Sequence, residues 1–360
     1  MNDFVFVAGP IEKPITGGEK FHRTVADFLN GKRQLRALIT EKDFPRTGKI
    51  FRPLLYNLIT LRKLWAYNNY TLIFPLRYSH GLLIFLFYVK MLRKVKIIGV
   101  VHHLYSLHHY TKWYDKTVFW LLEKLVINLS DALIVNSQST KNDVLKFDVN
   151  QKVFIVYPGT DIKPLPQKST VMPRQHEIDL IYVGTISRRK GLLYLLEAIY
   201  LLKDFSIKLN IVGDTNYEND YYTELCLYID QHSLAKKVEF HGRLSTVELD
   251  KIFRRVDIFV LPSLWEGYGI AIIDAMKYGI PIVASNIGAI PEIVTDGVNG
   301  FLIPPANPNA IAQALRCLIS DEKLRKMMIR ENLKKAMRFP NWQQVAENFY
   351  KTLTKIIDKY

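Results

Sequence analysis

The chain has 360 residues, of which 49% are apolar and 23% charged, a composition that excludes a disordered protein and leaves room for two α/β domains. Its two cysteines, Cys226 and Cys317, lack the number and spacing of a disulfide scaffold or a zinc site, which indicates a reducing compartment. The net charge of +15 is uneven, because residues 1–157 contain 23 Lys and Arg against 11 Asp and Glu. This half therefore predicts an anionic partner, and the sequence has no helix-turn-helix, RNP, KH or zinc motif that would indicate nucleic acid.

Short apolar runs alternate with helix-period segments along the first half of the chain. The expected strands cover 4–8, 35–40, 71–75, 96–101, 132–136 and 153–156, and the expected helices cover 19–29, 82–93 and 116–129. Such alternation indicates a parallel sheet. We interpret 82–89 as part of a buried helix with a solvated basic end, and the segment 157–166, with its prolines and glycine, as a linker.

A second alternating series follows the linker. Its expected strands cover 178–183, 208–212, 238–240, 257–261 and 281–284, and its expected helices lie near 190–203, 218–232, 246–254, 269–278 and 308–318. The tail is amphipathic, with one apolar helical face formed by Trp342, Val345, Phe349, Leu353, Ile356 and Ile357. The pattern thus predicts two Rossmann-like α/β domains around a central cleft, with ligand sites at the carboxyl ends of their strands.

The most informative segment is 262–285. It reads as the end of a buried strand, a glycine-rich loop, a short helix that begins near Gly269, and a further strand. An α/β sheet presents an anion site at such a helix start. Glu266 lies in the loop and Asp274 lies eight positions later, inside the helix. Acids in this position usually bind hydroxyl groups, so two acids predict two sets of bound hydroxyls.

Two further loops have the composition of anion sites. Gly17 and Gly18 lie between the first strand and the first helix, where glycine lets backbone N–H groups approach an anion closely. The segment 183–191 follows a strand, precedes a helix and contains the cations Arg188, Arg189 and Lys190. Fixed cations and helix N–H groups acting together favour a polyphosphate.

The spacing of Glu266 and Asp274 resembles the donor-binding signature of the retaining glycosyltransferases of family 4, which have the GT-B fold. The family pattern is Glu, seven residues, Glu, and this chain has Asp in the second position. The family's basic loop has an Arg after its first Gly and a Lys before its second. Lys190 matches the Lys, whereas Thr185 stands at the Arg position, so Arg189 or Arg188 would replace the missing charge.

The resemblance covers nearly the whole chain and implies a domain organisation. Residues 1–163 would form an acceptor-side domain, and residues 168–340 a nucleotide-sugar donor-binding domain. Residues 341–360 would form a C-terminal helix that crosses back to the first domain.

Roles for individual residues also follow from the resemblance. Glu266 would bind sugar hydroxyls and Asp274 the ribose, while Lys190 with Arg189 would stabilise the charge that grows on the leaving diphosphate. His102 matches a family histidine near the transferred sugar, and His103 replaces the Asp that often follows it. The implied catalytic residues are Glu266, Lys190 and His102, and the implied donor-binding residues are Gly17, Gly18, Arg189, Lys190, Glu266, Gly267, Tyr268, Gly269 and Asp274.

By this resemblance we predict a retaining hexosyltransferase that moves a sugar from a nucleotide-diphosphate sugar to a lipid-linked acceptor or a cell-envelope or polysaccharide glycan. No Asp-x-Asp pair that would hold a metal on the diphosphate follows a predicted strand, so neither a metal nor another cofactor is expected. Two alternatives remain open. One is a non-catalytic sugar-nucleotide-binding partner subunit, motivated by Thr185 and Asp274, and the other is a GT-B sugar-nucleotide epimerase.

Basic and aromatic residues are mixed over 46–69, which suits contact with an anionic membrane surface. The first residues lack the basic region of a signal peptide, and no apolar run approaches the roughly 20 residues of a spanning helix. We therefore expect a cytoplasmic protein that lies peripherally on the inner face of the membrane.

Overall fold

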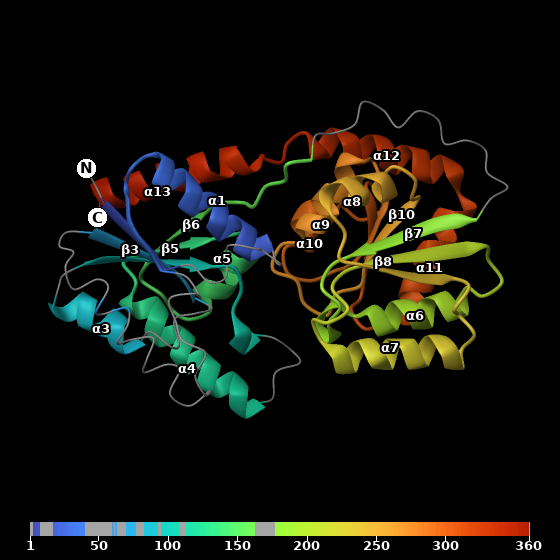
Figure 1. The fold of residues 1–360 in the computed structure, drawn as a ribbon, viewed down its shortest axis with the longest axis horizontal. Coiled ribbons are helices and arrows are strands. Elements are labelled where there is room, and N and C mark those ends of the chain that lie inside the picture. Colours follow the sequence, from blue (N-terminus) through green and yellow to red (C-terminus); the bar gives the residue numbers. More distant parts are fainter. Residues whose placement is uncertain are drawn as a thin grey trace. The chain divides into compact units, whose positions relative to one another are not determined.

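A computed structural model describes residues 3–7, 17–39, 60, 62, 70–76, 83–92, 95–107, 113–162 and 177–359. The chain divides into two compact units, each described by itself (Figure 1). Unit 1 contains residues 1–159 and 340–360, and unit 2 contains residues 160–339. The predicted membrane-surface segment 46–69 lies outside the described residues except for Thr60 and Arg62.

Unit 1 is built on a parallel sheet with the strand order β2-β1-β3-β4-β5-β6. Each of its strands lies where an apolar run predicted one. They are β1 (Asp3–Val7), β2 (Leu35–Ile39), β3 (Tyr70–Pro75), β4 (Lys96–Val101), β5 (Ala132–Val135) and β6 (Lys152–Ile155).

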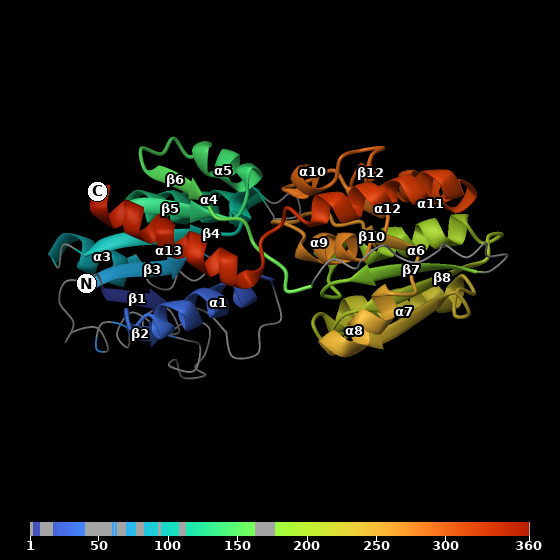
Figure 2. The ribbon, with the colours of Figure 1, turned by 90° about the horizontal axis from the view of Figure 1, so that it is seen from above.

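Helices cover both faces of this sheet. Helix α1 (Gly17–Gly31) and the C-terminal helix α13 (Trp342–Lys359) lie on one face, and α3 (Leu83–Leu92) and α4 (Trp113–Leu129) lie on the other (Figures 1 and 2). A short 3-10 turn, η3 (Tyr105–Leu107), precedes α4, and α5 (Gln138–Leu145) connects β5 to β6. Alternate strand residues face each layer, so that Val5, Leu72 and Leu133 pack in one core cluster with Phe85 of α3 and Val126 of α4.

The C-terminal helix belongs to unit 1, as the sequence predicted for a helix that crosses back. The ring of Phe349 in α13 contacts the ring of Phe21 in α1 edge-on, with centroids 5.7 Å apart. Both side chains are buried, and Lys96 Nζ of β4 donates to the carbonyl of Ile357 at 2.8 Å. Burial of its apolar face therefore fixes α13 on this unit.

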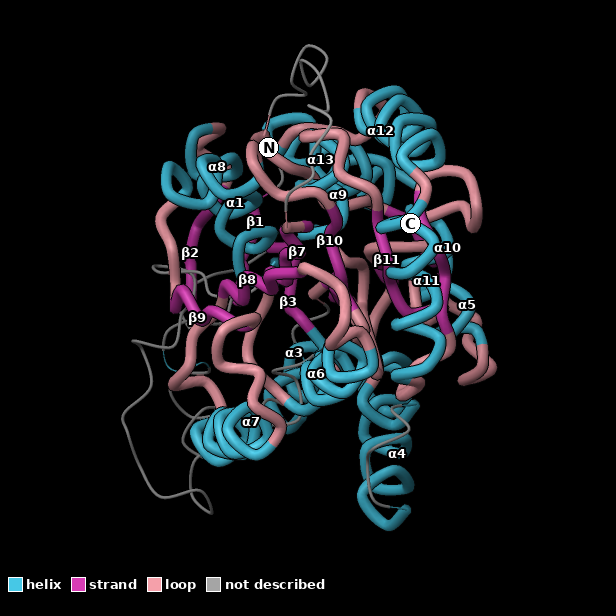
Figure 3. Tube along the Cα trace, turned by 90° about the vertical axis from the view of Figure 1, so that its right-hand side faces the viewer, coloured by secondary structure: helices cyan, strands magenta, loops and turns pink. Residues whose placement is uncertain are grey.

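Unit 2 has a second parallel sheet, with the order β12-β11-β10-β7-β8-β9. Its strands are β7 (Ile178–Val183), β8 (Ile207–Val212), β9 (Val238–Gly242), β10 (Ile258–Leu261), β11 (Ile282–Ser285) and β12 (Gly300–Ile303). Its helices are α6 (Leu192–Leu201), α7 (Asn219–Gln231), α8 (Thr246–Phe253), α9 (Ile270–Lys277), α10 (Ile290–Ile293), α11 (Pro308–Ser320) and α12 (Glu322–Ala336). Helices α6 and α7 lie on one side of the sheet and α8 and α9 on the other (Figures 1 and 3). The predicted fold class, two parallel α/β units, is confirmed.

The interpretation of 82–89 as buried is wrong for one side of α3. Phe85, Leu86 and Val89 pack into the core, but Ile84 is 62% exposed and Phe87 58% exposed. The mean hydropathy of this helix is high around its whole circumference, so hydropathy alone did not distinguish the inner face from the outer one.

Candidate functional site

The loop after β7 is held against the end of β10. It runs through Gly184 to a short 3-10 turn, η4 (Arg188–Lys190), and reaches α6 through Gly191, whose φ is +69°. A Cβ on Gly191 would lie 2.2 Å from the carbonyl oxygen of Pro262, so only glycine allows this approach. The backbone N–H of Leu264 also donates to the carbonyl of Arg189 at 2.8 Å.

This contact brings together three residues predicted from distant parts of the sequence. The Lys190 ammonium donates to Glu266 Oε2, and both side chains are 11% exposed. Arg189 Nη1 lies 3.9 Å from the same carboxylate oxygen. The buried hydroxyl of Ser263 lies 3.5 Å from it. The site is thus a cluster of two cations and one carboxylate, in which the Lys190–Glu266 pair is largely buried and Arg189 is half-buried.

The cluster stabilises the charged form of its carboxyl. Burial alone would raise the pKa of Glu266, but the attraction of Lys190 and then of Arg189 outweighs burial, and the pKa lies below its ordinary value. A hydrogen bond from the backbone N–H of Gly267 acts in the same direction. Burial, with repulsion from Arg189, lowers the pKa of Lys190, although the attraction of Glu266 opposes this. Glu266 is therefore an ionised hydrogen-bond acceptor at neutral pH.

The two arginines of the loop point to different partners. Arg189 donates to the carbonyl of Trp265 at 2.8 Å and its guanidinium lies over the Trp265 ring, 5.5 Å from the centroid. Arg188 instead forms an ion pair with Glu224 at 2.5 Å. Of the two candidates to replace the charge missing at Thr185, Arg189 is thus the one that lies beside Glu266.

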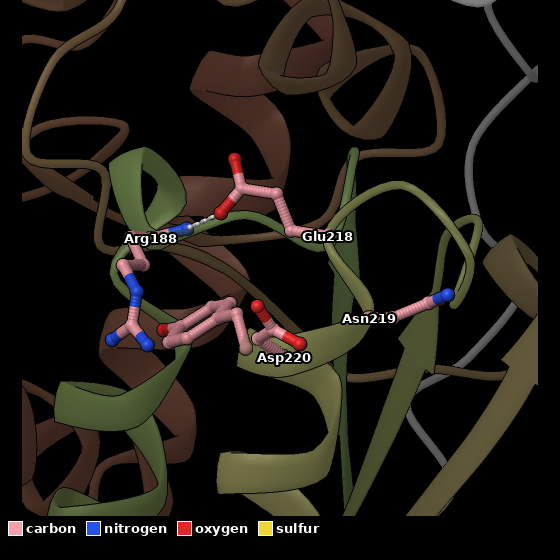
Figure 4. A pocket seen from close by; sticks show the side chains of 5 residues that line it. Arg188, Glu218, Asn219 and Asp220 are labelled. Atoms are coloured by element: carbon pink, nitrogen blue, oxygen red, sulfur yellow. Dashed lines mark hydrogen bonds between the residues drawn. The ribbon is translucent and has the colours of Figure 1, made fainter.

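A pocket of about 280 Å³ lies beside η4, lined by Arg188, Glu218, Asn219, Asp220 and Tyr221 (Figure 4). The backbone N–H of Arg188 donates to Glu218 Oε2 at 3.1 Å, the contact drawn in Figure 4. The guanidinium lies over the Tyr221 ring, 5.1 Å from its centroid. Carboxylates outnumber cations among the residues that line this pocket, which does not favour the binding of an anion there.

The glycine-rich loop approaches α9 as predicted. Gly269 has a φ of +92° and caps the first turn of α9, and Tyr268 before it is 5% exposed. A Cβ on Gly288 would lie 2.0 Å from the backbone carbonyl oxygen of Glu266. The loop that contains Gly288 therefore packs directly against the backbone of Glu266. Close backbone packing therefore fixes the direction in which the Glu266 side chain leaves the loop.

Asp274 lies inside α9 and has a partner that the sequence did not predict. The buried hydroxyl of Thr160 donates to Asp274 Oδ1 at 2.5 Å, and Thr160 Oγ1 accepts from the N–H of Ile162 at 3.1 Å. This carboxylate therefore ties the first residues of unit 2 to α9. Its assignment to the ribose stays a prediction.

In unit 1 the structure brings together one glycine, Gly18, and two histidines, His22 and His102. The predicted Gly17 and Gly18 are the first two residues of α1, and a Cβ on Gly18 would lie 3.5 Å from Cδ2 of the predicted His102. His102 follows β4, and its Nε2 lies 2.8 Å from Nε2 of His22 in α1. Phe21 contacts the His102 ring edge-on, with centroids 5.2 Å apart. Sequence reasoning missed His22, although it lies one helical turn after Gly18.

The turn after His102 and His103 is held by a buried carboxylate. Glu123 of α4 accepts from the backbone N–H of Tyr105 at 2.6 Å and from the Ser106 hydroxyl at 2.5 Å. Burial raises the pKa of Glu123 although these hydrogen bonds oppose it. The adjacent His108 and His109 lie outside the described residues.

Two features are absent from the described parts of the chain. No group of three or more His, Cys, Asp and Glu there could hold a metal ion. No described helix has both the length and the apolar character needed to cross a bilayer.

The two units match two family models. The model described as glycosyl transferases group 1 matches residues 168–335, and the model described as glycosyltransferase family 4 matches residues 22–163. Two uncharacterized proteins are similar to the chain. One, from the cps region of Klebsiella pneumoniae, is 24% identical over 76% of this chain and 76% of its own length. The other, a glycosyltransferase of Methanocaldococcus jannaschii, is 28% identical over 68% of this chain and 66% of its own length.

A D-inositol 3-phosphate glycosyltransferase of Corynebacterium glutamicum is 26% identical over 63% of this chain, and the match spans 57% of that protein. Among solved structures, the fold is similar to sucrose-phosphate synthase from Thermosynechococcus elongatus, with a TM-score of 0.85, 16% identity and all of both chains covered. It is also similar to Anabaena HepE in complex with UDP-glucose, with a TM-score of 0.78 and 18% identity over 98% of this chain and 99% of that one. The chain belongs to glycosyltransferase family 4 and is a glycosyltransferase with the GT-B fold.

Proposed function

We propose that the protein is a retaining, metal-independent transferase that moves a sugar from a nucleotide-diphosphate sugar to a lipid-linked acceptor or a cell-envelope or polysaccharide glycan. The observation that carries this proposal is the buried ion pair of Lys190 and Glu266 with Arg189 beside it. Two cations against one carboxylate leave one excess positive charge beside a buried ion pair, and such a charge attracts a diphosphate.

The chemistry of transfer assigns a task to each member of the cluster. When the bond to the sugar breaks, negative charge grows on the leaving diphosphate. Lys190 and Arg189 are already held in place by Glu266 and by the Trp265 carbonyl, so they stabilise that charge without reorganisation. The ionised Glu266 accepts hydrogen bonds from sugar hydroxyls, and Asp274 accepts those of the ribose.

Retention of configuration is explained by attack on the same face of the sugar that the diphosphate leaves. The leaving phosphate then takes the proton of the acceptor hydroxyl, so no protein carboxylate is needed as a general base. His102, beside Gly18, faces the sugar in this proposal.

The relatives support a choice of donor and acceptor for this proposal. HepE binds UDP-glucose according to its structure, which favours a UDP-sugar as donor here. The Corynebacterium relative is named for a phosphorylated acceptor and the Klebsiella relative for a cps region. The net charge of +12 over residues 1–157 suits a phosphorylated or lipid-linked acceptor and a place on the inner face of the membrane.

The test is calorimetric titration of UDP-, GDP-, ADP- and TDP-sugars without added metal. The variants are Lys190→Met and, as a matched control, Lys236→Met on an exposed residue of the same unit. We expect one nucleotide class to bind the wild type and the control alike, and to bind Lys190→Met about tenfold or more weakly. Binding that is equal in all three proteins would overturn the assignment of the diphosphate site.

Turnover separates a transferase from a binding subunit. Incubation with the bound sugar nucleotide and an extract of lipid-linked glycans should release the nucleoside diphosphate, with EDTA having no effect. Nuclear magnetic resonance of the product should show the anomeric configuration of the donor. Binding without turnover would favour the partner-subunit alternative, and an inverted product would exclude retention.

A further inference from the structure

Two neighbouring helices of unit 1 each expose an apolar stripe. On α3 the stripe consists of Ile84, Phe87 and Met91, which are 62%, 58% and 61% exposed. On α4 it consists of Val118, Leu121 and Leu125, which are 57%, 62% and 47% exposed. Both sets follow the spacing i, i+3, i+7, which places each set on one side of its helix. We call these six side chains the α3–α4 face.

The opposite sides of the same helices are buried in the sheet core. Phe85, Leu86 and Val89 of α3 and Val126 and Ile127 of α4 belong to one cluster with the strands. The two helices contact each other and lie side by side on one face of the sheet (Figures 1 and 2). The α3–α4 face therefore consists of a second apolar side on each of two neighbouring helices, which the core of unit 1 does not use.

The charged side chains of these two helices are mostly basic. Among the described side chains of the two helices, 83–91 and 116–129, the sole carboxylate is Glu123, which is 1% exposed and bonded to the η3 turn. Lys90, Lys116 and Lys124 are half-buried on these helices. Lys90 forms an ion pair with Asp131, which lies beyond the end of α4, and Lys124 lies over the Trp120 ring. Across 83–129 the sequence has seven Lys and Arg and two Asp and Glu.

We propose that the α3–α4 face docks on an anionic lipid bilayer. Apolar side chains flanked by lysines on one surface bind where acyl chains meet negatively charged headgroups. A second copy of the chain would bring the same lysines together, so charge complementarity favours lipid over self-association. The inference rests on the proposed function for its lipid-linked acceptor, and it places membrane contact on α3 and α4 instead of on 46–69.

The test is co-sedimentation of the full chain with vesicles of phosphatidylcholine alone and of phosphatidylcholine with phosphatidylglycerol. The double variant Phe87→Glu/Leu121→Glu changes one residue of each stripe. The matched control is Leu227→Glu/Val247→Glu, at apolar positions of unit 2 that are 55% and 67% exposed. Thermal unfolding and nucleotide-sugar binding are measured on every protein, because they report on the fold and on the donor site separately.

We expect the wild type and the control to bind the anionic vesicles, less so in high salt, and the α3–α4 variant to bind about tenfold or more weakly. Its unfolding temperature and donor affinity should be unchanged. Equal vesicle binding by both double variants, or no binding by the wild type, would overturn the proposal. So would light scattering that shows a wild-type dimer and a monomeric α3–α4 variant. A wild type that binds the anionic vesicles but no sugar nucleotide would count against the proposed function and not against this face.

Discussion

His22 and His102 are joined through their Nε2 atoms, 2.8 Å apart, between helix α1 and the end of strand β4. A hydrogen bond between two imidazole nitrogens needs a proton on one of them and a lone pair on the other. Each ring therefore determines the tautomer of its neighbour. If His102 faces the sugar, His22 is the residue that determines which of its nitrogens carries a proton.

Replacing His22 tests this positioning role. His22→Leu removes the partner of His102 Nε2, and we expect kcat to fall about tenfold or more while donor affinity stays close to that of the wild type. His22→Gln retains a group that can donate or accept, and should recover most of the rate. Steady-state kinetics of both variants check this. Equal losses in the two, in proportion to a lowered unfolding temperature, would reduce His22 to a packing residue.

Removing one member of the buried ion pair should destabilise unit 2. Glu266→Gln leaves the Lys190 ammonium buried beside Arg189 without its carboxylate, at a cost of about 3 kcal/mol in the free energy of unfolding. The double variant Lys190→Met/Glu266→Gln should be more stable than Glu266→Gln, yet should still not bind the donor. A double-mutant cycle by urea denaturation measures the coupling. Additive changes in the free energy of unfolding would show that the two side chains have no coupling energy.

The same pair predicts a response to acid. Although burial would raise it, Lys190 and Arg189 hold the folded-state pKa of Glu266 below its ordinary value of 4.5. As the pH falls, the unfolded chain therefore takes up this proton first. The stability that the carboxylate contributes is complete above pH 4.5 and is lost as the pH falls through the lowered folded-state pKa. The stability difference between wild type and Glu266→Gln should be constant above pH 4.5 and shrink below it; a constant difference throughout would contradict the assignment.

Asp274 has two tasks that substitution can separate. Asp274→Asn keeps an oxygen for the Thr160 hydroxyl but removes the charge, so nucleotide affinity should fall while stability changes little. Thr160→Val removes the hydrogen bond from the other side and should cost about 1 kcal/mol of stability with donor affinity intact. Calorimetry and thermal unfolding of both variants provide the comparison. If Asp274→Asn bound the nucleotide as tightly as the wild type, the carboxylate would have only its structural task.

Gly191 should tolerate no side chain. At a φ of +69°, with the Pro262 carbonyl 2.2 Å from the position of a Cβ, Gly191→Ala must displace either η4 or the end of β10. We expect a loss of about 1–3 kcal/mol and weaker donor binding, because the displacement moves Lys190 away from Glu266. Gly297→Ala is a matched control, since its φ is +70° and no atom lies within 4 Å of its Cβ position. Donor binding that survives in Gly191→Ala would show that the loop can shift without opening the pair.

The sequence predicted every strand of unit 1 and the strands β7 to β11 of unit 2. It missed β12 (Gly300–Ile303), because the turn residues before it, Asp296 to Asn299, dominate the local pattern. It also missed α12, whose buried side is a narrow stripe of Met328, Asn332 and Ala336. Asn332 is fully buried and donates to the carbonyls of Ile280 and Asn299. Hydrogen bonds to distant loops therefore fix the position of this helix, and they leave no apolar period in its sequence.

The sequence predicted those residues of the candidate site that form a motif within one loop. It missed the contacts that these residues make with partners on other elements. Lys190 and Glu266 were both named from their own loops, but their direct contact depends on Gly191 meeting Pro262, seventy-one residues apart by number. The partnership of His22 with His102 and that of Thr160 with Asp274 likewise join separate elements. Single-sequence patterns report local chemistry, and such pairings become visible only once the fold brings the elements together.

Helix α13 has a consequence for the order in which the chain folds during synthesis. Unit 2 is one continuous stretch, 160–339, whereas unit 1 is completed only by the last residues, 340–360. Domains usually fold from the N-terminus as they leave the ribosome. Here the core contact of Phe21 cannot form until Phe349 has been synthesised. Unit 2 can therefore reach its native packing while unit 1 still lacks part of its core. A nascent chain that stops before residue 340 would therefore present the apolar side of α1 to chaperones and proteases, with a finished unit 2 attached to it.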